Sequence, residues 1–169
     1  MVSDEASSLA SAWLRDAARP ELDAALRAVF DEASREVDER RPICLAGGHC
    51  CRFAEYGHDL FVTGLETAWF LLRAGRPPER RDRSLPILAS GACPWLDGRL
   101  CGARSARPLG CRTFFCDPRH AAWSTGLLER LHARIRSMHE EFGVVYRYGE
   151  WLRMLSLFAD AGSTRRGTS

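Results

Sequence analysis

The stretch CPWLDGRLCGARSARPLGCRTFFC, residues 93–116, decides how this chain is organised. Its four cysteines are Cys93, Cys101, Cys111 and Cys116. The other three stand upstream in CLAGGHCC, residues 44–51, as Cys44, Cys50 and Cys51. We call these two stretches the downstream and upstream clusters. Because they hold every cysteine of the chain, the sequence predicts one metal centre shared between them, with all seven cysteines as candidate ligands.

The composition limits the possible functions. With 169 residues the chain is long enough for one domain with a sizeable core. A net charge of +2 is too small to indicate a nucleic-acid partner. All 24 basic residues are arginine, so Schiff-base chemistry and lysine general bases are excluded.

The start of the chain, MVSDE, has neither a basic nor an apolar signal region, and no apolar run reaches the ~20 residues that span a bilayer. We therefore expect a cytoplasmic protein that does not enter a membrane. Cytoplasmic thiols are kept reduced, and an odd number of cysteines cannot all pair. Metal ligation explains the seven cysteines better than disulfides do.

Apolar residues at helical spacing predict helices over 3–19 and 21–40, with Pro20 starting the second. Thr63 and Glu66 form a capping box for a third helix that ends at Gly75, with a stripe made of Leu65, Ala68, Trp69 and Leu72. A short helix up to Ser90 is also expected.

Asp97-Gly98 predicts a hairpin turn that brings Cys93 and Cys101 together on paired strand ends. Two late helices are expected, one from a Ser124 cap to Phe142 and one from Tyr148 to Ala161.

The predicted fold is mainly α, with a small irregular cysteine-rich metal-binding centre and a short hairpin between N- and C-terminal helical pairs. We expect a single domain over 1–161. Its parts are a helical pair at 1–41, the cysteine-cluster core at 42–118 and a helical pair at 119–161, with a disordered tail at 162–169.

The cysteine spacings lack the paired C-x2-C units of a zinc ribbon. Neighbouring side chains of an extended segment point to opposite sides, so Cys50-Cys51 indicates a polynuclear site, or one ligand beside a packed thiol. Thiolates select zinc, copper(I) or iron–sulfur clusters. One or two of the seven are expected to be buried apolar side chains instead.

The downstream pattern C-x-x-L, C-x5-R-P-x-x-C-R-x-F resembles the zinc- or iron-chelating cysteine-cluster family often called YkgJ-like. That family also carries an upstream CxxCxxCC motif, which aligns with residues 44–51. The resemblance covers roughly residues 44–116 and implies a metal or iron–sulfur site. Flagellin lysine methylases contain a similar cluster region.

Two positions depart from the family pattern. Gly47 stands where its second cysteine is usual, and Arg104 stands where an aromatic residue is common. Cys116 or His49 is a candidate to replace the missing ligand.

Arg107 and Arg112 either offset thiolate charge and donate hydrogen bonds to sulfur, or pair with carboxylates and brace the loop. His49 is otherwise a surface residue of a Gly-rich turn, and His58-Asp59 is only an adjacent pair. Solvent-exposed faces account for His120, His132 and His139.

Three functions follow. The first is an iron–sulfur cluster protein with an electron-transfer or redox accessory role, whose partner is a redox or modifying enzyme. The second is a structural zinc module that mediates protein–protein interaction. The third is part of a metal-assisted, methylase-like modifying enzyme, although the chain has no Gly-rich nucleotide loop and its catalytic residues are unknown.

Overall fold

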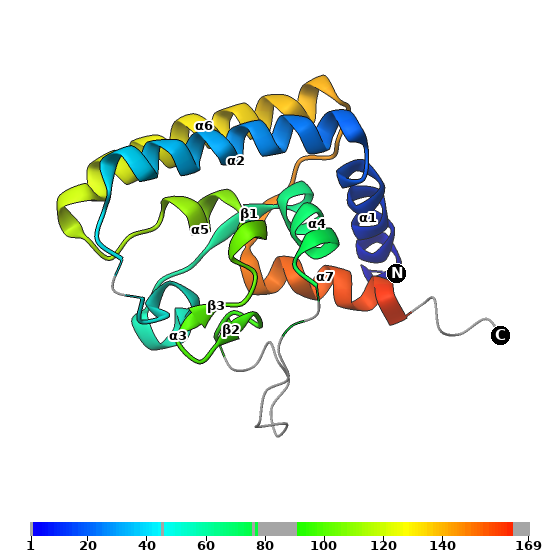
Figure 1. The fold of residues 1–169 in the computed structure, drawn as a ribbon. Helices are drawn as coiled ribbons and strands as arrows, with labels where there is room; N and C mark the ends of the chain where they lie inside the picture. Colours follow the sequence, from blue (N-terminus) through cyan, green and yellow to red (C-terminus); the bar gives the residue numbers. More distant parts are fainter. Residues whose placement is uncertain (1, 45, 76, 78–90, 164–169) are drawn as a thin grey trace.

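The structure is a computed structural model that describes residues 2–44, 46–75, 77 and 91–163. The predicted fold class is confirmed, because helices dominate and a short hairpin lies among them (Figure 1). The helices are α1 (Val2–Ala17), α2 (Pro20–Arg40), α3 (Phe53–Tyr56), α4 (Gly64–Arg73), α5 (Leu109–Thr113), α6 (Ala121–Glu141) and α7 (Trp151–Ser163). The strands are β1 (Phe61–Thr63), β2 (Leu96–Asp97), β3 (Leu100–Cys101) and β4 (Tyr148–Glu150). Single 3₁₀ turns are η1 (His49–Cys51), η3 (Arg104–Ala106) and η4 (Pro118–His120).

The long helices α2 and α6 run antiparallel as one layer, at the top of Figure 1. Pro20 begins α2 as predicted, and the apolar stripe from Leu22 to Ala33 is buried. On the outer side Glu32 pairs with Arg130 and Arg134. Surface pairs of this kind contribute at most about 1 kcal/mol, so the buried stripe holds the layer together.

Below this layer, α1 packs against α4 and α7. The indole of Trp13 is fully buried, and its Nε1 donates to the carbonyl of Val145 at 2.8 Å. Gly64 lies against this ring so closely that a Cβ there would be 2.3 Å from Cε2. A glycine is therefore required where α4 meets α1.

The predicted capping box at the start of α4 is confirmed. Glu66 accepts hydrogen bonds from the backbone N–H and the hydroxyl of Thr63, each at 2.9 Å. Its other oxygen accepts from Leu109 N at 3.1 Å, which ties α5 to α4 through a buried carboxylate. The expected stripe is wrong at one position, because Leu72 is exposed. The side chain of Phe70, two residues earlier in α4, is buried instead.

The prediction of a helix from Tyr148 is wrong at its start. Residues 148–150 form β4, which pairs antiparallel with β1 in the register Phe61↔Glu150. Glu150 then accepts from the N–H groups of Leu152 and Arg153, both at 2.9 Å, and so starts α7. The pairing joins segments far apart in the chain, which local periodicity does not detect.

Three further differences concern the late helices. The Ser124 cap is wrong, because Asp117 caps η4 and that turn runs directly into α6. His139 is buried rather than solvent-exposed. Helix α7 continues to Ser163, two residues into the predicted tail. The remaining tail residues, 164–169, and the expected helix up to Ser90, on 78–90, lie outside the described residues.

Among the described residues, no helix is both long and apolar enough to cross a membrane.

Candidate metal centre

The backbones of the upstream and downstream clusters are hydrogen-bonded to each other. Cys93 N donates to the carbonyl of Cys51 at 2.7 Å, and Ala54 N donates to Gly91 O at 3.0 Å. Gly48, at φ 72°, lies against the hairpin, where a Cβ would be 3.0 Å from Leu96 Cδ1. Two stretches separated by some 40 residues in the sequence therefore form one structural unit.

The predicted hairpin is present, with its turn one residue later than expected. Asp97 pairs with Leu100, and Leu96 pairs with Cys101. The turn consists of Gly98, at φ 58°, and Arg99. Cys101 lies on the strand β3, whereas Cys93 precedes β2 rather than lying on it.

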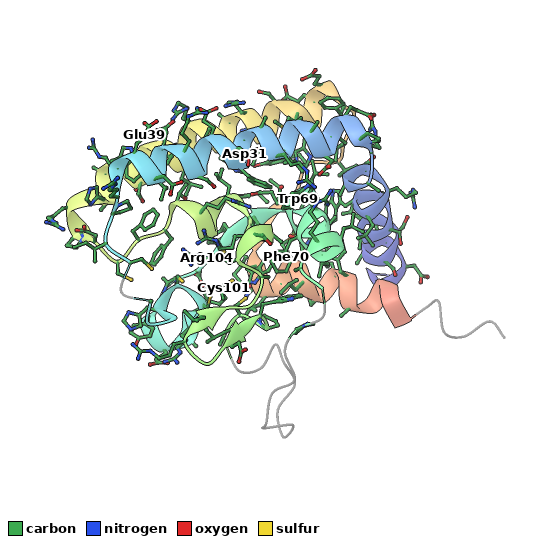
Figure 2. All side chains as sticks on the ribbon, in the orientation of Figure 1. Asp31, Glu39, Trp69, Phe70, Cys101 and Arg104 are labelled. Atoms are coloured by element: carbon green, nitrogen blue, oxygen red, sulfur yellow. The ribbon has the colours of Figure 1, made fainter. Side chains whose placement is uncertain are left out.

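All seven cysteines line one cavity of about 290 Å³, which we call the thiol cavity. Phe70, Trp95 and Trp151 form its aromatic side, with Phe70 edge-on to both indoles at centroid distances of 4.6 and 4.9 Å. Figure 2 shows Cys101, on the hairpin, and Arg104, shortly after it, below the α2–α6 layer. Helices that contain no cysteine thus support one wall of a space lined by thiols.

The thiols differ in exposure. Cys51 and Cys93 are buried, whereas Cys44, Cys50 and Cys116 are exposed. None of the seven, all of which the structure describes, is in a disulfide. The cavity therefore runs from a buried wall to a rim that solvent reaches.

The premise that Cys50 and Cys51 lie in an extended segment is wrong. They belong to the 3₁₀ turn η1, which brings their Sγ atoms to 3.9 Å. Two thiolates on one tetrahedral zinc ion are about 3.8 Å apart, given Zn–S bonds of about 2.3 Å. Adjacent cysteines in this turn are therefore compatible with a shared ion as well as with a polynuclear site.

The buried thiol of Cys51 is central to the hydrogen bonding of the cluster. Its interactions with the sulfur atoms of Cys101, Cys50 and Cys93 raise its own pKa. The hydrogen bond from Cys51 lowers the pKa of both Cys50 and Cys101 to about 6, and it also lowers the pKa of Cys93. Burial raises the pKa of Cys111. Cys50 and Cys101 thus reach the thiolate form needed for metal binding most readily.

Arg107 and Arg112 both line the thiol cavity, but they differ in their hydrogen-bond partners and in their effect on the thiols. Arg107 donates to the carbonyls of Arg104 and Cys111, at 3.1 and 3.3 Å, and its charge favours the thiolates of Cys50 and Cys101. Both expected roles, charge compensation and loop bracing, are thus open to it.

Arg112 is buried and donates to Arg107 O at 2.7 Å, Ser105 O at 2.8 Å and Ser34 Oγ at 3.2 Å. Burial lowers its pKa to about 10. It braces the loop through carbonyl groups, not through the carboxylate that the sequence suggested.

No group of three or more Cys, His, Asp or Glu side chains among the described residues is already spaced to hold one ion. A cysteine side chain has a single χ angle, so rotation about it repositions each sulfur without moving the backbone. The donor set fits a thiophilic metal by chemistry and by its common cavity, and binding one would require such rotations.

Sequence reasoning missed a histidine–carboxylate pair beside the cavity. His120 Nδ1 lies 3.0 Å from Asp117 Oδ2, and hydrogen bonds from Arg119 and His120 hold the pKa of Asp117 below its usual range. The Asp-Pro start of η4 was the available signal. The adjacent His58-Asp59 does not form such a pair: His58 stacks on Phe114 at 4.9 Å, with Nε2 3.5 Å from Cys50 O.

Comparison with known proteins found no matching family model, no matching curated protein and no matching solved structure.

Proposed function

We propose that this chain is a metal-binding protein whose thiol cavity holds an iron–sulfur cluster in an electron-transfer or redox accessory role. The observation that carries the proposal is that all seven cysteines line one cavity. A single tetrahedral zinc ion needs four ligands, so seven thiols exceed that requirement. Clusters bind several thiolates on different iron atoms.

The charges around the cavity support a strongly anionic centre. Four arginines and a single carboxylate, that of Asp38, are among the described lining residues. The arginines are Arg99, Arg104, Arg107 and Arg112. Several thiolates together with bridging sulfide carry net negative charge, and neighbouring guanidinium groups offset it. Net charge and hydrogen bonds to sulfur are the features that set the potential of a cluster.

The exposed rim of the cavity supports electron exchange with a protein partner. Cys44, Cys50 and Cys116 are exposed, so a docked protein would come close to the centre. Arg99 and Arg104 are exposed on the same rim. Charge complementarity then favours an acidic face on the partner, a redox or modifying enzyme.

A second candidate, a structural zinc module, is favoured by one distance. The Sγ atoms of Cys50 and Cys51 are 3.9 Å apart, close to the spacing of two zinc ligands. In that case zinc would organise the two clusters for a protein partner, and chelation would unfold the centre.

Analysis of protein purified without oxygen tests both candidates. The proposal predicts brown protein with iron, acid-labile sulfide and broad visible charge-transfer absorption. Colourless protein with stoichiometric zinc would establish the second candidate instead. Protein that contains neither iron nor zinc would overturn both candidates.

Substitutions locate the centre. Cys101→Ala and Cys111→Ala are each expected to abolish metal binding, with circular dichroism confirming that the helices remain. Leu100→Ala is the matched control, because this exposed neighbour on β3 also lines the cavity but carries no donor atom. Full metal content in both cysteine variants would show that the centre lies elsewhere.

A further inference from the structure

The side chain of His49 occupies the space above Gly47. A Cβ added at Gly47 would lie 2.8 Å from His49 Nε2, 3.1 Å from Cδ2 and 3.2 Å from Cε1. Gly47 does not have a positive φ, unlike its neighbour Gly48 at 72°. The backbone at position 47 is therefore not in the left-handed region, and the imidazole ring occupies the space that a Cβ there would need.

His49 lines the thiol cavity. It packs on Tyr56 with a centroid distance of 4.4 Å, and it is the one imidazole among the described residues that line the cavity. The next residue is Cys50, whose sulfur belongs to the hydrogen-bonded thiol group. His58, by contrast, is outside the lining and contacts Cys50 only near its backbone carbonyl.

From this geometry we infer that His49 is a nitrogen ligand of the metal centre, which makes the centre a mixed cysteine–histidine site. The inference rests on the proposed function. Imidazole binds zinc and iron alike. A neutral imidazole in place of a thiolate lowers the negative charge of a cluster, and replacement of cysteine by histidine raises the potential of iron–sulfur centres. His49 would thus tune the centre as well as hold it.

X-ray absorption on the metal-loaded wild-type protein is the first measurement. For a zinc-loaded sample, a nitrogen shell at about 2.0–2.1 Å is expected beside sulfur at about 2.3 Å. For a reduced cluster, pulsed electron paramagnetic resonance is expected to detect ¹⁴N coupling from the ring. His49→Ala should remove either signal, and it should lower metal retention against a chelator at least ~10-fold.

A double substitution makes the test specific to the space shared by Gly47 and His49. Gly47→Cys alone is expected to bind metal poorly, because its Cβ would displace the ring. Gly47→Cys combined with His49→Ala has the space for a thiolate, and it should recover binding with sulfur ligands only. His58→Ala is the matched control, and it should keep the nitrogen signal and wild-type retention.

The outcomes separate the inference from the proposed function. Wild-type protein that binds no metal refutes the proposed function. Metal-loaded wild type without a nitrogen ligand overturns the inference alone, and so does a nitrogen signal that persists in His49→Ala. The wild-type measurement needs no variant, so poor folding of a mutant cannot obscure the answer.

Discussion

The helical frame, formed by α1, α2, α4, α6 and α7, and the thiol cavity are packed in opposite ways. In the frame the large side chains are sealed, with Trp13 at 0 % and Trp151 at 1 % exposure. Its buried carboxylate, Glu66, accepts three hydrogen bonds from Thr63 and Leu109. This carboxylate is therefore fully paired, although Nε2 of the buried His139 has no hydrogen-bond partner among the described residues.

The cavity is only partly enclosed, and the Sγ atoms of Cys50 and Cys51 in its lining lie 3.9 Å apart. The thiols of Cys44, Cys50 and Cys116 reach solvent. Weak S–H donors contribute little stability. We infer that the frame supplies the folding free energy, whereas the cavity would gain its final order only from the bound group proposed above. Four predictions test this division.

The largest effect is expected at Gly64, in the frame. Gly64→Ala would place a Cβ 2.3 Å from the Trp13 ring, so either α4 or α1 must move. We expect a loss of about 3 kcal/mol in the free energy of unfolding, measured by urea denaturation. Gly126→Ala in α6 is the control: nothing lies within 4 Å of its added Cβ, and a gain of up to about 1 kcal/mol is expected. Equal stability of the two variants would contradict the sealed frame.

The second effect concerns Glu66, which links α4 of the frame to α5 beside the cavity through the N–H of Leu109. Glu66→Gln keeps the shape but turns one acceptor into an amide donor, facing the N–H of Thr63 or Leu109. We expect a loss of about 2 kcal/mol, together with looser attachment of α5, which carries Cys111. Glu150→Gln, at a partly exposed cap of α7, should cost only about 0.5 kcal/mol. Amide hydrogen exchange on α5 would show whether its link to α4 loosens. Unchanged protection of α5 would contradict the role of Glu66 in holding it.

The third prediction is a pH dependence within the frame. His139 is buried, with Nδ1 donating to Val144 O at 3.2 Å and Nε2 without a partner among the described residues. Burial lowers its pKa below the ordinary value of about 6.5. Hydrogen bonds to the backbone of Val144 and Val145 oppose this shift in part.

The unfolded chain therefore binds a proton at His139 more readily than the folded one. Stability is at its full value above pH ~6.5 and is lost as the pH falls from there through the folded pKa. His139→Gln keeps a donor for Val144 but does not titrate. Its unfolding free energy should fall less steeply below pH ~6.5 than that of wild type, and parallel curves would count against the prediction.

The smallest effect is expected in the cavity. Cys50 is exposed, so Cys50→Ser in metal-free protein should change the free energy of unfolding by less than about 0.5 kcal/mol. The same substitution should lower metal retention sharply. A large loss of stability without metal would mean that the thiols help to hold the frame, and the two regions would not be separate.

The local parts of the fold were predictable from the sequence. Pro20 and the apolar spacing after it predicted α2, and Thr63 with Glu66 predicted the cap of α4, because each signal lies within a few residues. The pairing of β1 with β4 and the burial of His139 were not predictable in this way. Both depend on contacts between segments that lie far apart in the chain or on opposite sides of a turn.

For the candidate centre, the available donor atoms can be read from the residues alone: seven thiols, in two clusters, without a lysine. That all seven line a single cavity, and that His49 fills the space above Gly47, is known only from the folded chain. Residue identity sets the chemistry of each donor, but the direction of a side chain is set by its backbone turn and by the neighbours that pack against it.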